Sequence, residues 1–366
     1  MSEATQSGTF PCPGCGSMLE FDPGAGHLVC PACGNTAPIP VDRGAVIMEY
    51  PLSEAERMAP TDWESPTVTV SCTGCGTKTI VPTDSGTAEC PFCGSRQLVR
   101  DEASRTIRPE SLMPFRIPKA DAKARFGTWI RKKWFAPEAA KKAARADRIQ
   151  GIYVPYWTYD AQTDYNWSAE AGTHYYVTET RTVTGSDGKT RTEHVQVQKT
   201  RWRPVFGHGN RCFDDVPVNA SRNESRRHME KLDFSFSDLV PYRPEFLLGF
   251  QAERYTVDVS EGFDMACETM RAALRQDVRS SIVADEVRNV QVDARFLDVR
   301  FKHLLAPIWL SSFRFNNKPY RFVVNGQDGT VQGQYPVSPW KVALVVALVA
   351  LAAVGIYFLV QVLQRQ

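Results

Sequence analysis

The sequence predicts an α+β protein with two small cysteine-rich modules at its start and one long apolar helix at its end. Two pairs of CxxC motifs occupy the first hundred residues, and the second pair repeats the spacing of the first. Segments of helical and of strand periodicity then alternate through the middle of the chain. The last feature is an uncharged run of nineteen residues, Val342–Val360. A chain of 366 residues has room for two or three domains.

Eight of the ten cysteines fall in four CxxC knuckles, each followed by a glycine. Four thiolates suit the tetrahedral preference of Zn²⁺, and glycine tolerates the positive φ that lets the backbone fold back under the sulfur. The spacing is typical of zinc ribbons, and we predict two of them, over 8–40 and 67–100, with one structural Zn²⁺ each. The predicted ligands are Cys12, Cys15, Cys30 and Cys33 in ribbon 1 and Cys72, Cys75, Cys90 and Cys93 in ribbon 2, followed by Gly16, Gly34, Gly76 and Gly94.

The sequence gives less support to two other roles for these cysteines, iron binding and disulfide formation. Iron in a rubredoxin-like site would use the same four thiolates. Disulfides belong to oxidising compartments, and the polar N-terminus of this sequence lacks the apolar core of an export signal. A closed four-cysteine site leaves no position for a substrate, so we expect structural rather than catalytic metals. The isolated Cys212 and Cys267 are expected to be small core residues.

A linker over 41–66 separates the ribbons and contains a predicted short helix, Ser53–Met58, with Ser53 as N-cap and Glu56 in the capping-box position. Apolar residues at helical spacing predict an amphipathic helix over Lys119–Phe135, and a second helical stretch follows it. A buried strand, GIYVPYWTYDA, and a hairpin around Gly185–Lys189 complete a first half of the body, over 101–235.

The pattern then recurs over 236–338, and the recurrence predicts a body of two related halves. RYTVDV is expected to be a strand and Phe263–Val283 a helix. VQVDARFLDVRF and LLAPIWLSSFRF are expected to be separate strands, followed by the hairpin PYRFVVNGQDGTVQGQYP. APIWLS in this half echoes VPYWTY in the first half.

The apolar run predicts a transmembrane helix over 340–361, because nineteen residues at about 1.5 Å each approach the thickness of the hydrocarbon layer. Its predicted flanks are Trp340 and Lys341 on one side and Arg365 on the other, and the charges are balanced. A helix so near the C-terminus, without an export signal, leads us to expect a single-pass protein of a bacterial inner membrane. Its N-terminal body is then expected in the cytoplasm.

Charge is distributed unevenly along the chain, although the formal net charge is only +2. Residues 1–100 carry a net charge of −6, whereas residues 101–148 carry +7. The basic run 119–148 is either a solvated helix face or a surface that lies against anionic lipid headgroups. The acidic ribbons oppose the phosphate neutralisation on which nucleic-acid binding depends, and Lys78, Arg96 and Arg100 are the candidate contacts in ribbon 2.

Several segments resemble a bacterial family of membrane-anchored double zinc-ribbon proteins, which carry labels such as TFIIB-type zinc ribbon, primosomal protein N′-like and YdjG-like. The resemblance rests on the paired CPxCG knuckles and on three segments: PFRIPKADAKARFGTWIRKKWFAP, GIYVPYWTYDA and LLAPIWLSSFRFNNKPYRFVVNGQDGTVQGQYP. It implies a membrane platform that works with PspA-like or SPFH-type proteins in envelope stress. A helicase is not implied, because the nearest string to a P-loop, GSDGKT, has Val183 where the first glycine is required.

Together these features predict a non-enzymatic adaptor that recruits cytoplasmic protein partners to the membrane and takes no small-molecule substrate. The alternative function is a nucleic-acid-binding zinc-ribbon protein at the membrane. An enzyme is disfavoured because the histidines form neither an HExxH motif nor a visible nucleophile–base pair. They are scattered along the chain, at His27, His174, His194, His208, His228 and His303.

Overall fold

The structure, a computed structural model, describes residues 10–41, 44–58, 67–82, 90–93, 95–100, 107–144, 149–184, 190–223, 225–316 and 318–363. The chain forms two compact units, each assembled from several stretches. Unit 1 contains Met1–Asp160, Asp214–Ala266 and Asp298–Val337, and unit 2 contains Ala161–Phe213, Cys267–Leu297 and Ser338–Gln366. The division of the body into halves at 101–235 and 236–338 stays a prediction.

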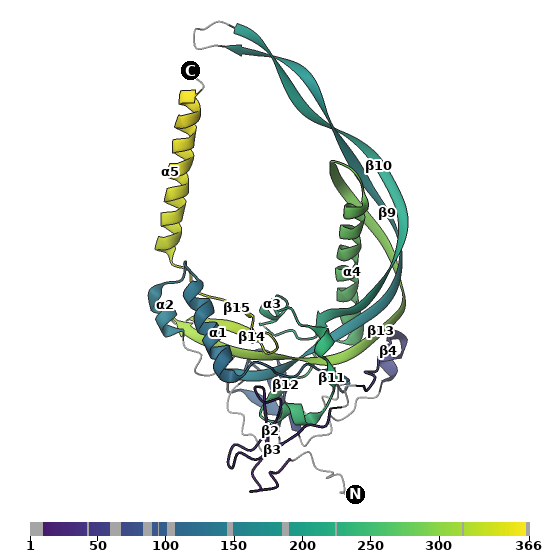
Figure 1. Cartoon of the computed structure of the whole chain (residues 1–366), viewed down its shortest axis with the longest axis vertical. Helices are drawn as coiled ribbons and strands as arrows, with labels where there is room; N and C mark the ends of the chain where they lie inside the picture. Colours follow the sequence, from purple (N-terminus) through teal and green to yellow (C-terminus); the bar gives the residue numbers. More distant parts are fainter. Residues whose placement is uncertain are drawn as a thin grey trace. The chain divides into compact units, whose positions relative to one another are not determined.

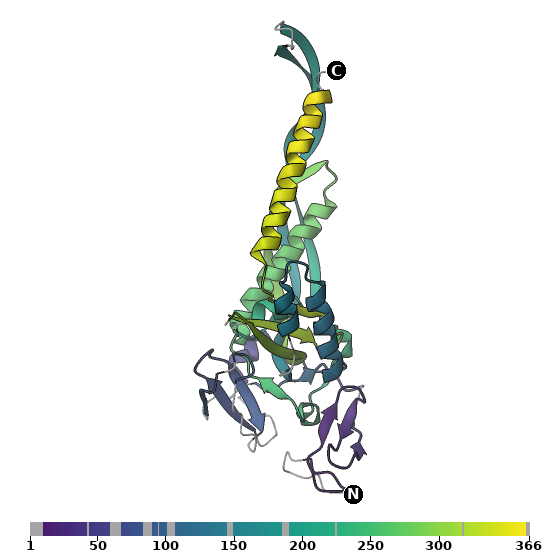
Figure 2. The same cartoon turned by 90° about the vertical axis from the view of Figure 1, so that its left-hand side faces the viewer.

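Each ribbon is a small antiparallel sheet that carries its CxxC knuckles in the adjoining turns, and Figure 2 shows the two ribbons as separate modules of unit 1. In ribbon 1, β1 (Glu20–Asp22) pairs with β2 (His27–Val29), which pairs with β3 (Thr36–Ala37). In ribbon 2, β5 (Thr67–Cys72) pairs with both β6 (Lys78–Pro82) and β7 (Leu98–Arg100).

The sheet of ribbon 2 continues into the sheet of the body, in which β4 and β9 to β15 are labelled in Figure 1. Strand β6 pairs with β12, which runs parallel to β9. Strand β13 lies beside β9 and pairs with β4, β8 and β14. The remaining bounds are β4 Tyr50–Pro51, β8 Ser111–Leu112, β9 Gln150–Thr184, β10 Thr190–Asn219, β11 Val240–Pro241, β12 Gln251–Glu253, β13 Glu286–Phe315, β14 Lys318–Asn325 and β15 Val331–Gly333.

In unit 1 the central sheet is buried on both faces, and the cysteine knuckles of the two ribbons belong to clusters on different faces. Tyr153 of β9 and Trp309 of β13 belong to a core cluster that also contains Phe21 of ribbon 1. Their sequence neighbours point the other way, because side chains alternate along a strand. Ile152 and Ile308 accordingly belong to a second cluster, which contains Cys72, Cys90 and Phe92 of ribbon 2. This arrangement explains why GIYVPYWTY and LLAPIWL are almost continuously apolar.

Helix α1 (Lys119–Lys132) buries the apolar stripe that predicted it, through Ala122, Phe126 and Ile130. The Phe126 ring stacks on Phe322 of β14 with 3.5 Å between ring centroids, so α1 covers the side of the sheet near β14 and β15 (Figure 1). The other helices are α2 Glu138–Ala143, α3 Arg226–Met229, α4 Val259–Ser281 and α5 Pro339–Leu363, with 3₁₀ turns at Leu52–Arg57, Phe236–Asp238 and Pro244–Leu247.

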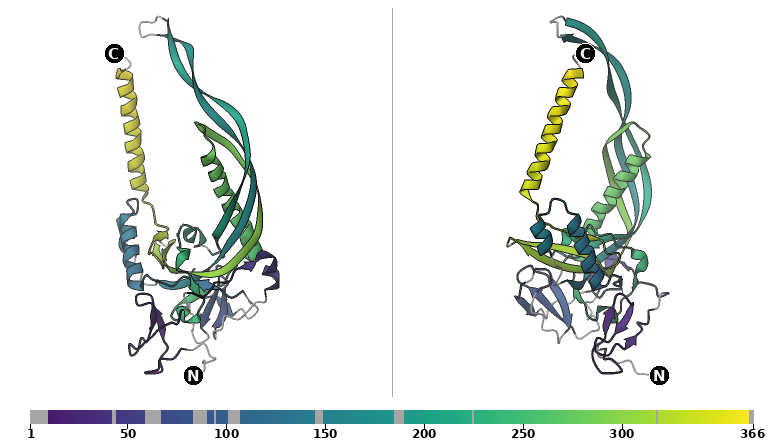
Figure 3. Two further views of the ribbon diagram at one scale, coloured as in Figure 1. Left: turned by 45° about the vertical axis from the view of Figure 1, so that its right-hand side comes forward. Right: turned by 60° about the vertical axis from the view of Figure 1, so that its left-hand side comes forward.

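Unit 2 contains the long hairpin of β9 and β10, with β13 beside β9. Beyond Ala161, β9 and β10 twist around one another (Figure 3). Aromatic rings of β9 lie over glycines of β10, since a Cβ on Gly207 would lie 2.7 Å from the Trp167 ring. The predicted hairpin is thus present, and its turn, Gly185–Lys189, lies outside the described residues.

The predicted α+β body with two four-cysteine clusters and a C-terminal apolar helix is confirmed. Three element predictions are wrong in detail. The helix predicted at Ser53–Met58 is a 3₁₀ turn over Leu52–Arg57, with Pro51 as N-cap and no side-chain cap. VQVDARFLDVRF and LLAPIWLSSFRF form one strand, β13, which continues through positive φ angles at Asn289 and Asp298.

The strand predicted at RYTVDV is also displaced, because β12 ends at Glu253. The backbone that follows is bonded outside the sheet. The Trp157 indole N–H donates to the Val257 carbonyl at 2.9 Å, and the Thr256 N–H donates to the Ala220 carbonyl at 2.8 Å. Distant partners thus satisfy polar groups that a strand ladder would otherwise have satisfied.

Candidate metal centres

In ribbon 1 the four predicted ligands lie together. The Sγ atoms of Cys12 and Cys33 are 3.6 Å apart, and those of Cys15 and Cys30 are 3.5 Å apart. All four sulfurs lie within 4.8 Å of one another. Each close pair joins one cysteine of the first knuckle to one of the second, so the two knuckles face each other across a common centre.

Ribbon 2 repeats this geometry in more buried surroundings. Its Sγ–Sγ distances are 3.5 Å for Cys72–Cys93 and 3.7 Å for Cys75–Cys90. Cys75 and Cys93 are half-buried, whereas the corresponding Cys15 and Cys33 of ribbon 1 are exposed. The partly buried Leu98 and Phe234 pack against the cluster that contains this site. Water and chelators therefore have easier access to the ribbon 1 sulfurs than to those of ribbon 2.

All four knuckles share one backbone hydrogen bond, from the first cysteine to a carbonyl five residues later. The distances from the cysteine N–H are 2.7 Å for Cys12, 2.8 Å for Cys30, 2.9 Å for Cys72 and 2.7 Å for Cys90. In three knuckles the glycine then takes a φ of 73–74°, at Gly16, Gly34 and Gly76. Gly94, the fourth predicted glycine, lies outside the described residues. The predicted role of these glycines is thus confirmed at three knuckles.

The sulfur arrangement fits a tetrahedral metal ion. A Zn–S bond of about 2.3 Å requires tetrahedral sulfurs about 3.8 Å apart, and the close pairs are 3.5–3.7 Å apart. The Gly14 N–H lies 3.4 Å from the Cys12 Sγ, and the Asn35 amide nitrogen lies 3.7 Å from the same atom. Both donors stabilise a thiolate. When bound, Zn²⁺ would join the two knuckles and leave no coordination position for a substrate.

Proton sharing among the thiols of ribbon 2 makes their acidities unequal. The hydrogen bond between Cys75 and Cys90 is the strongest of the effects that lower the pKa of Cys75, to about 4. The same contact is the strongest of the effects that raise the pKa of Cys90. A metal ion bound at neutral pH must therefore displace protons from the remaining thiols, so its affinity falls as the pH falls.

The two isolated cysteines differ from each other. Cys267 of α4 is 5% exposed, as predicted for a core residue. The same prediction is wrong for Cys212, which is exposed on β10, because strand alternation there directs Phe213 inward instead. Within the described part of the chain, no histidine belongs to a group that could hold a metal.

A third cluster, which the sequence analysis missed, combines three carboxyl groups with a lysine in unit 1. Glu49, Asp160 and Asp215 come close enough to share a cation, but the Lys302 ammonium already lies 2.7 Å from both Glu49 and Asp215. Lys302 is 6% exposed. Its charge replaces that of a metal ion, so the cluster is a buried ion network. The four residues lie far apart in the sequence, so no local pattern could have revealed them.

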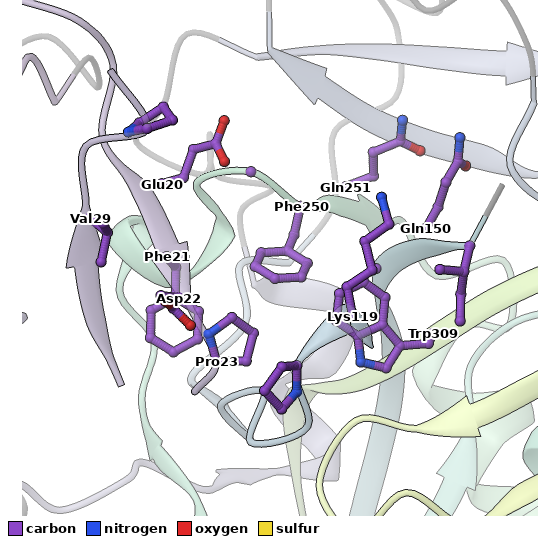
Figure 4. Close-up of a pocket in the computed structure, with 15 residues that line it drawn as sticks. Glu20, Phe21, Asp22, Pro23, Val29, Lys119, Gln150, Phe250, Gln251 and Trp309 are labelled. Carbon is purple, nitrogen blue, oxygen red and sulfur yellow. The ribbon is translucent and has the colours of Figure 1, made fainter. Parts of the chain in front are cut away.

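A pocket of about 490 Å³ lies between ribbon 1 and the rest of unit 1. Glu20 and Asp22 line one side, Lys119 and Gln150 line the other, and the Phe250 ring lies between them (Figure 4). Its lining residues include neither cysteine, serine, threonine nor histidine. Its ionisable lining groups are the carboxylates of Glu20 and Asp22 and the ammonium of Lys119.

Helix α5 is the other candidate functional element, and in the described part of the chain it alone is long and apolar enough to cross a membrane. Its 25 residues span about 37 Å, and none of its most apolar window is buried. Trp340 is 74% exposed near its start, next to Lys341. Arg365, the predicted flank on the other side, lies outside the described residues.

One curated protein is similar to this chain over most of its length. It is the uncharacterized protein YdjG of Bacillus subtilis (strain 168), which is 27% identical over 345 residues. The alignment covers 92% of each chain. No protein-family model matches the sequence, and no solved structure matches it.

Proposed function

We propose that this protein is a membrane-anchored zinc-ribbon adaptor without catalytic activity, which recruits protein partners to a bacterial inner membrane. One observation carries the proposal: two closed four-sulfur sites occur in the same chain as an unburied helix of membrane-spanning length. The sites have the donor set and spacing of structural zinc, and the helix needs an apolar environment that water does not supply.

Zinc is the metal that we propose for both ribbons, in preference to iron. Zinc has no redox role and needs only the tetrahedral thiolate cage. The eight knuckle cysteines are thiols rather than disulfides, which favours a reducing compartment and hence a cytoplasmic location for the body.

Two zinc ribbons on a membrane-anchored body are suited to recruiting cytoplasmic proteins. Each ribbon packs on the body through one side and leaves residues exposed on the other, such as Met18 in ribbon 1 and Val99 in ribbon 2. The family resemblance supports PspA-like or SPFH-type proteins as partners. The net charge of −6 over residues 1–100 disfavours the alternative, a nucleic-acid-binding protein.

The test uses the full chain, purified in detergent with its native partners from membranes. Elemental analysis is expected to find two zinc ions per chain. A Cys72→Ser/Cys75→Ser variant is expected to keep one zinc and to lose a reproducible set of proteins that co-purify with the wild type. The matched control is Cys212→Ser, which changes an exposed cysteine outside the ribbons and is expected to keep both zinc ions and all partners.

Three results would contradict the proposal. The first is fewer than two metal ions per wild-type chain, and the second is release of the wild-type chain from membranes by alkaline carbonate. The third is a set of co-purifying proteins that is the same for all three chains. A salt-dependent complex of the purified chain with DNA or RNA would favour the nucleic-acid alternative.

A further inference from the structure

The C-terminal end of α1 and the following α2 form a strongly basic surface in unit 1. From Lys119 to Ala143 the chain has eight Lys and Arg residues against Asp121 and Glu138. Arg131 and Lys132 are exposed, and neither forms an ion pair with a carboxylate among the described residues. Trp134, beside them, is 51% exposed. We call Arg131, Lys132, Trp134 and Lys142 the basic corner.

An aromatic contact beside this corner joins the C-terminal end of α1 to the segment that leads into α5. The Tyr335 ring meets the Trp129 ring edge to face, with 6.0 Å between centroids. The Lys133 ammonium lies 4.7 Å from the centre of the Trp129 ring and 5.5 Å from that of the Tyr335 ring. All three residues belong to unit 1, so the C-terminal end of α1 and Tyr335 have a defined arrangement.

Chain length then limits how far the basic corner can be from the membrane helix. Tyr335 precedes Pro339, the first residue of α5, by four residues. Four residues span at most about 14 Å, whatever the angle between the body and α5. The headgroup layer adds about 5–8 Å on each side of the hydrocarbon, and charges act over about 8 Å at physiological ionic strength. Tyr335, together with the Trp129 and Lys133 side chains that contact it, is therefore within electrostatic reach of lipid headgroups when α5 spans a membrane. Arg131 and Lys132 lie within three residues of Trp129 on the same helix.

We propose that the basic corner binds the headgroups of anionic lipids and so holds the body against the membrane that α5 anchors. The proposal rests on the proposed function in one respect, the membrane insertion of α5. Charge complementarity favours this occupant, because exposed cations without carboxylate partners gain most from a negative surface. The exposed Trp134 adds an amphipathic ring of the type that is enriched at the membrane–water boundary.

The sequence left two roles open for the basic run 119–148, a solvated helix face and a surface that binds lipid headgroups. The proposed headgroup contact divides these two roles between parts of the run. The solvated face and the lipid-binding face lie on the same helix. Lys123 is exposed earlier in α1, six residues before Trp129. We assign headgroup binding to the C-terminal end of α1 and to α2, and solvation to the beginning of α1.

The test uses the full chain in lipid nanodiscs, with Trp134 replaced by the photoreactive amino acid benzoylphenylalanine. Irradiation followed by mass spectrometry measures lipid adducts on the peptide that carries residue 134. Adducts are expected in discs that contain phosphatidylglycerol and are expected to fall about fivefold or more in discs of phosphatidylcholine alone. Each basic residue near an anionic surface contributes a factor of about five in affinity. A decrease of similar size is expected for Arg131→Gln/Lys132→Gln in phosphatidylglycerol discs.

The matched control is Arg227→Gln/Lys231→Gln, which removes two exposed cations elsewhere in unit 1 and is expected to leave the adduct yield unchanged. Equal yields in the two kinds of disc, or an equal loss in the control variant, would overturn the proposal. Extraction of membranes with alkaline carbonate distinguishes failure of the membrane anchoring from failure of the headgroup contact alone. Release of the wild type from membranes contradicts the anchoring itself, whereas a retained chain without lipid adducts contradicts only the headgroup contact.

Discussion

At the residue scale, the buried ion network around Lys302 brings two carboxyl groups into direct contact. Burial is the strongest of the effects that raise the pKa of Asp160, to about 7, and its hydrogen bond with Glu49 raises it further. The backbone N–H of Asp215 donates to the Asp160 carboxyl at 2.6 Å. The arrangement therefore favours a protonated Asp160 that shares its proton with Glu49.

This raised pKa predicts that Asp160→Asn stabilises the protein more at pH 8 than at pH 5. The folded state retains a proton that the unfolded state releases above about pH 3.8, so stability falls as the pH rises toward 7. Asparagine resembles the protonated acid and does not incur this loss. Because the group is half-buried, we reduce the full effect to about 1 kcal/mol, or about 2–4 °C in Tm.

Thermal unfolding of the full chain in detergent at the two pH values measures this difference. Asp164→Asn, which changes an exposed carboxylate further along β9, is the matched control and is expected to show no such pH dependence. The same Tm shift of the Asp160→Asn variant at both pH values would contradict the assignment of a proton to the Asp160 carboxyl group.

Lys302 gives a second prediction at this scale. Replacing it by methionine leaves Glu49 and Asp215 without their cation in a largely buried site. Breaking a buried pair from one side costs about 3–5 kcal/mol, so we expect Lys302→Met to lower the unfolding free energy by about that amount. Chemical denaturation measures it, and the exposed Lys231→Met is the control. A loss below about 1 kcal/mol would show that water already screens the network.

At the element scale, α1 shows how far periodicity predicts structure and where it stops. The spacing of Ala122, Phe126 and Ile130 predicted both the helix and its buried face, and all three are buried. Periodicity could not predict that Phe126 would meet Phe322, because that contact joins elements almost two hundred residues apart. The strand prediction at RYTVDV was wrong for the same reason, because the hydrogen-bond partners of this segment, Trp157 and Ala220, come from distant parts of the sequence.

The stacking of Phe126 on Phe322 predicts a large effect for Phe126→Ala. Phe126 is 1% exposed, and truncation of such a ring costs about 3–5 kcal/mol through lost burial and the cavity that remains. The full chain in detergent is expected to lose that much stability in chemical denaturation. Lys123→Ala changes an exposed position of the same helix and is expected to leave stability within about 0.5 kcal/mol of the wild type.

The metal centres were the most predictable part of the chain, for a local reason. Each CxxC knuckle closes within a few residues, its backbone hydrogen bond repeats in all four knuckles, and its glycine φ repeats in the three knuckles whose glycine is described. The Lys302 network has no such local pattern, because it joins residues from four separate parts of the sequence. The metal sites could therefore be predicted from the sequence, because their ligands follow a local pattern. Contacts that depend on tertiary packing, such as the Lys302 network, could not.

At the scale of the whole molecule, the cysteine knuckles of the two ribbons pack on opposite faces of the sheet in unit 1, which strand β6 of ribbon 2 itself extends. Cys12 and Cys30 belong to one buried cluster, and Cys72 and Cys90 belong to the other. Each metal site is thus part of the packing of the body. A domain as small as one ribbon buries too little surface to fold alone, so its metal supplies much of its stability.

Removal of the metals is therefore expected to destabilise the body together with the ribbons. A chelator such as EDTA should lower the Tm reported by tryptophan fluorescence, because all eight tryptophans, Trp157 and Trp309 of the central sheet among them, lie outside the ribbons. The more exposed sulfurs of ribbon 1 should lose their metal first, so two kinetic phases of zinc release are expected, and Cys12→Ser/Cys15→Ser should abolish the faster one.

The measurement combines a colorimetric zinc indicator with tryptophan fluorescence during thermal unfolding of the full chain. Cys212→Ser is the control and is expected to keep both phases and the wild-type Tm. A body whose Tm is the same with and without chelator, although all zinc has left, would show that the ribbons are independent modules. Coupling predicts the opposite: each released metal loosens knuckles whose cysteines belong to a buried cluster of the body, so the loss of one ligand pair lowers the stability of the sheet against which they pack.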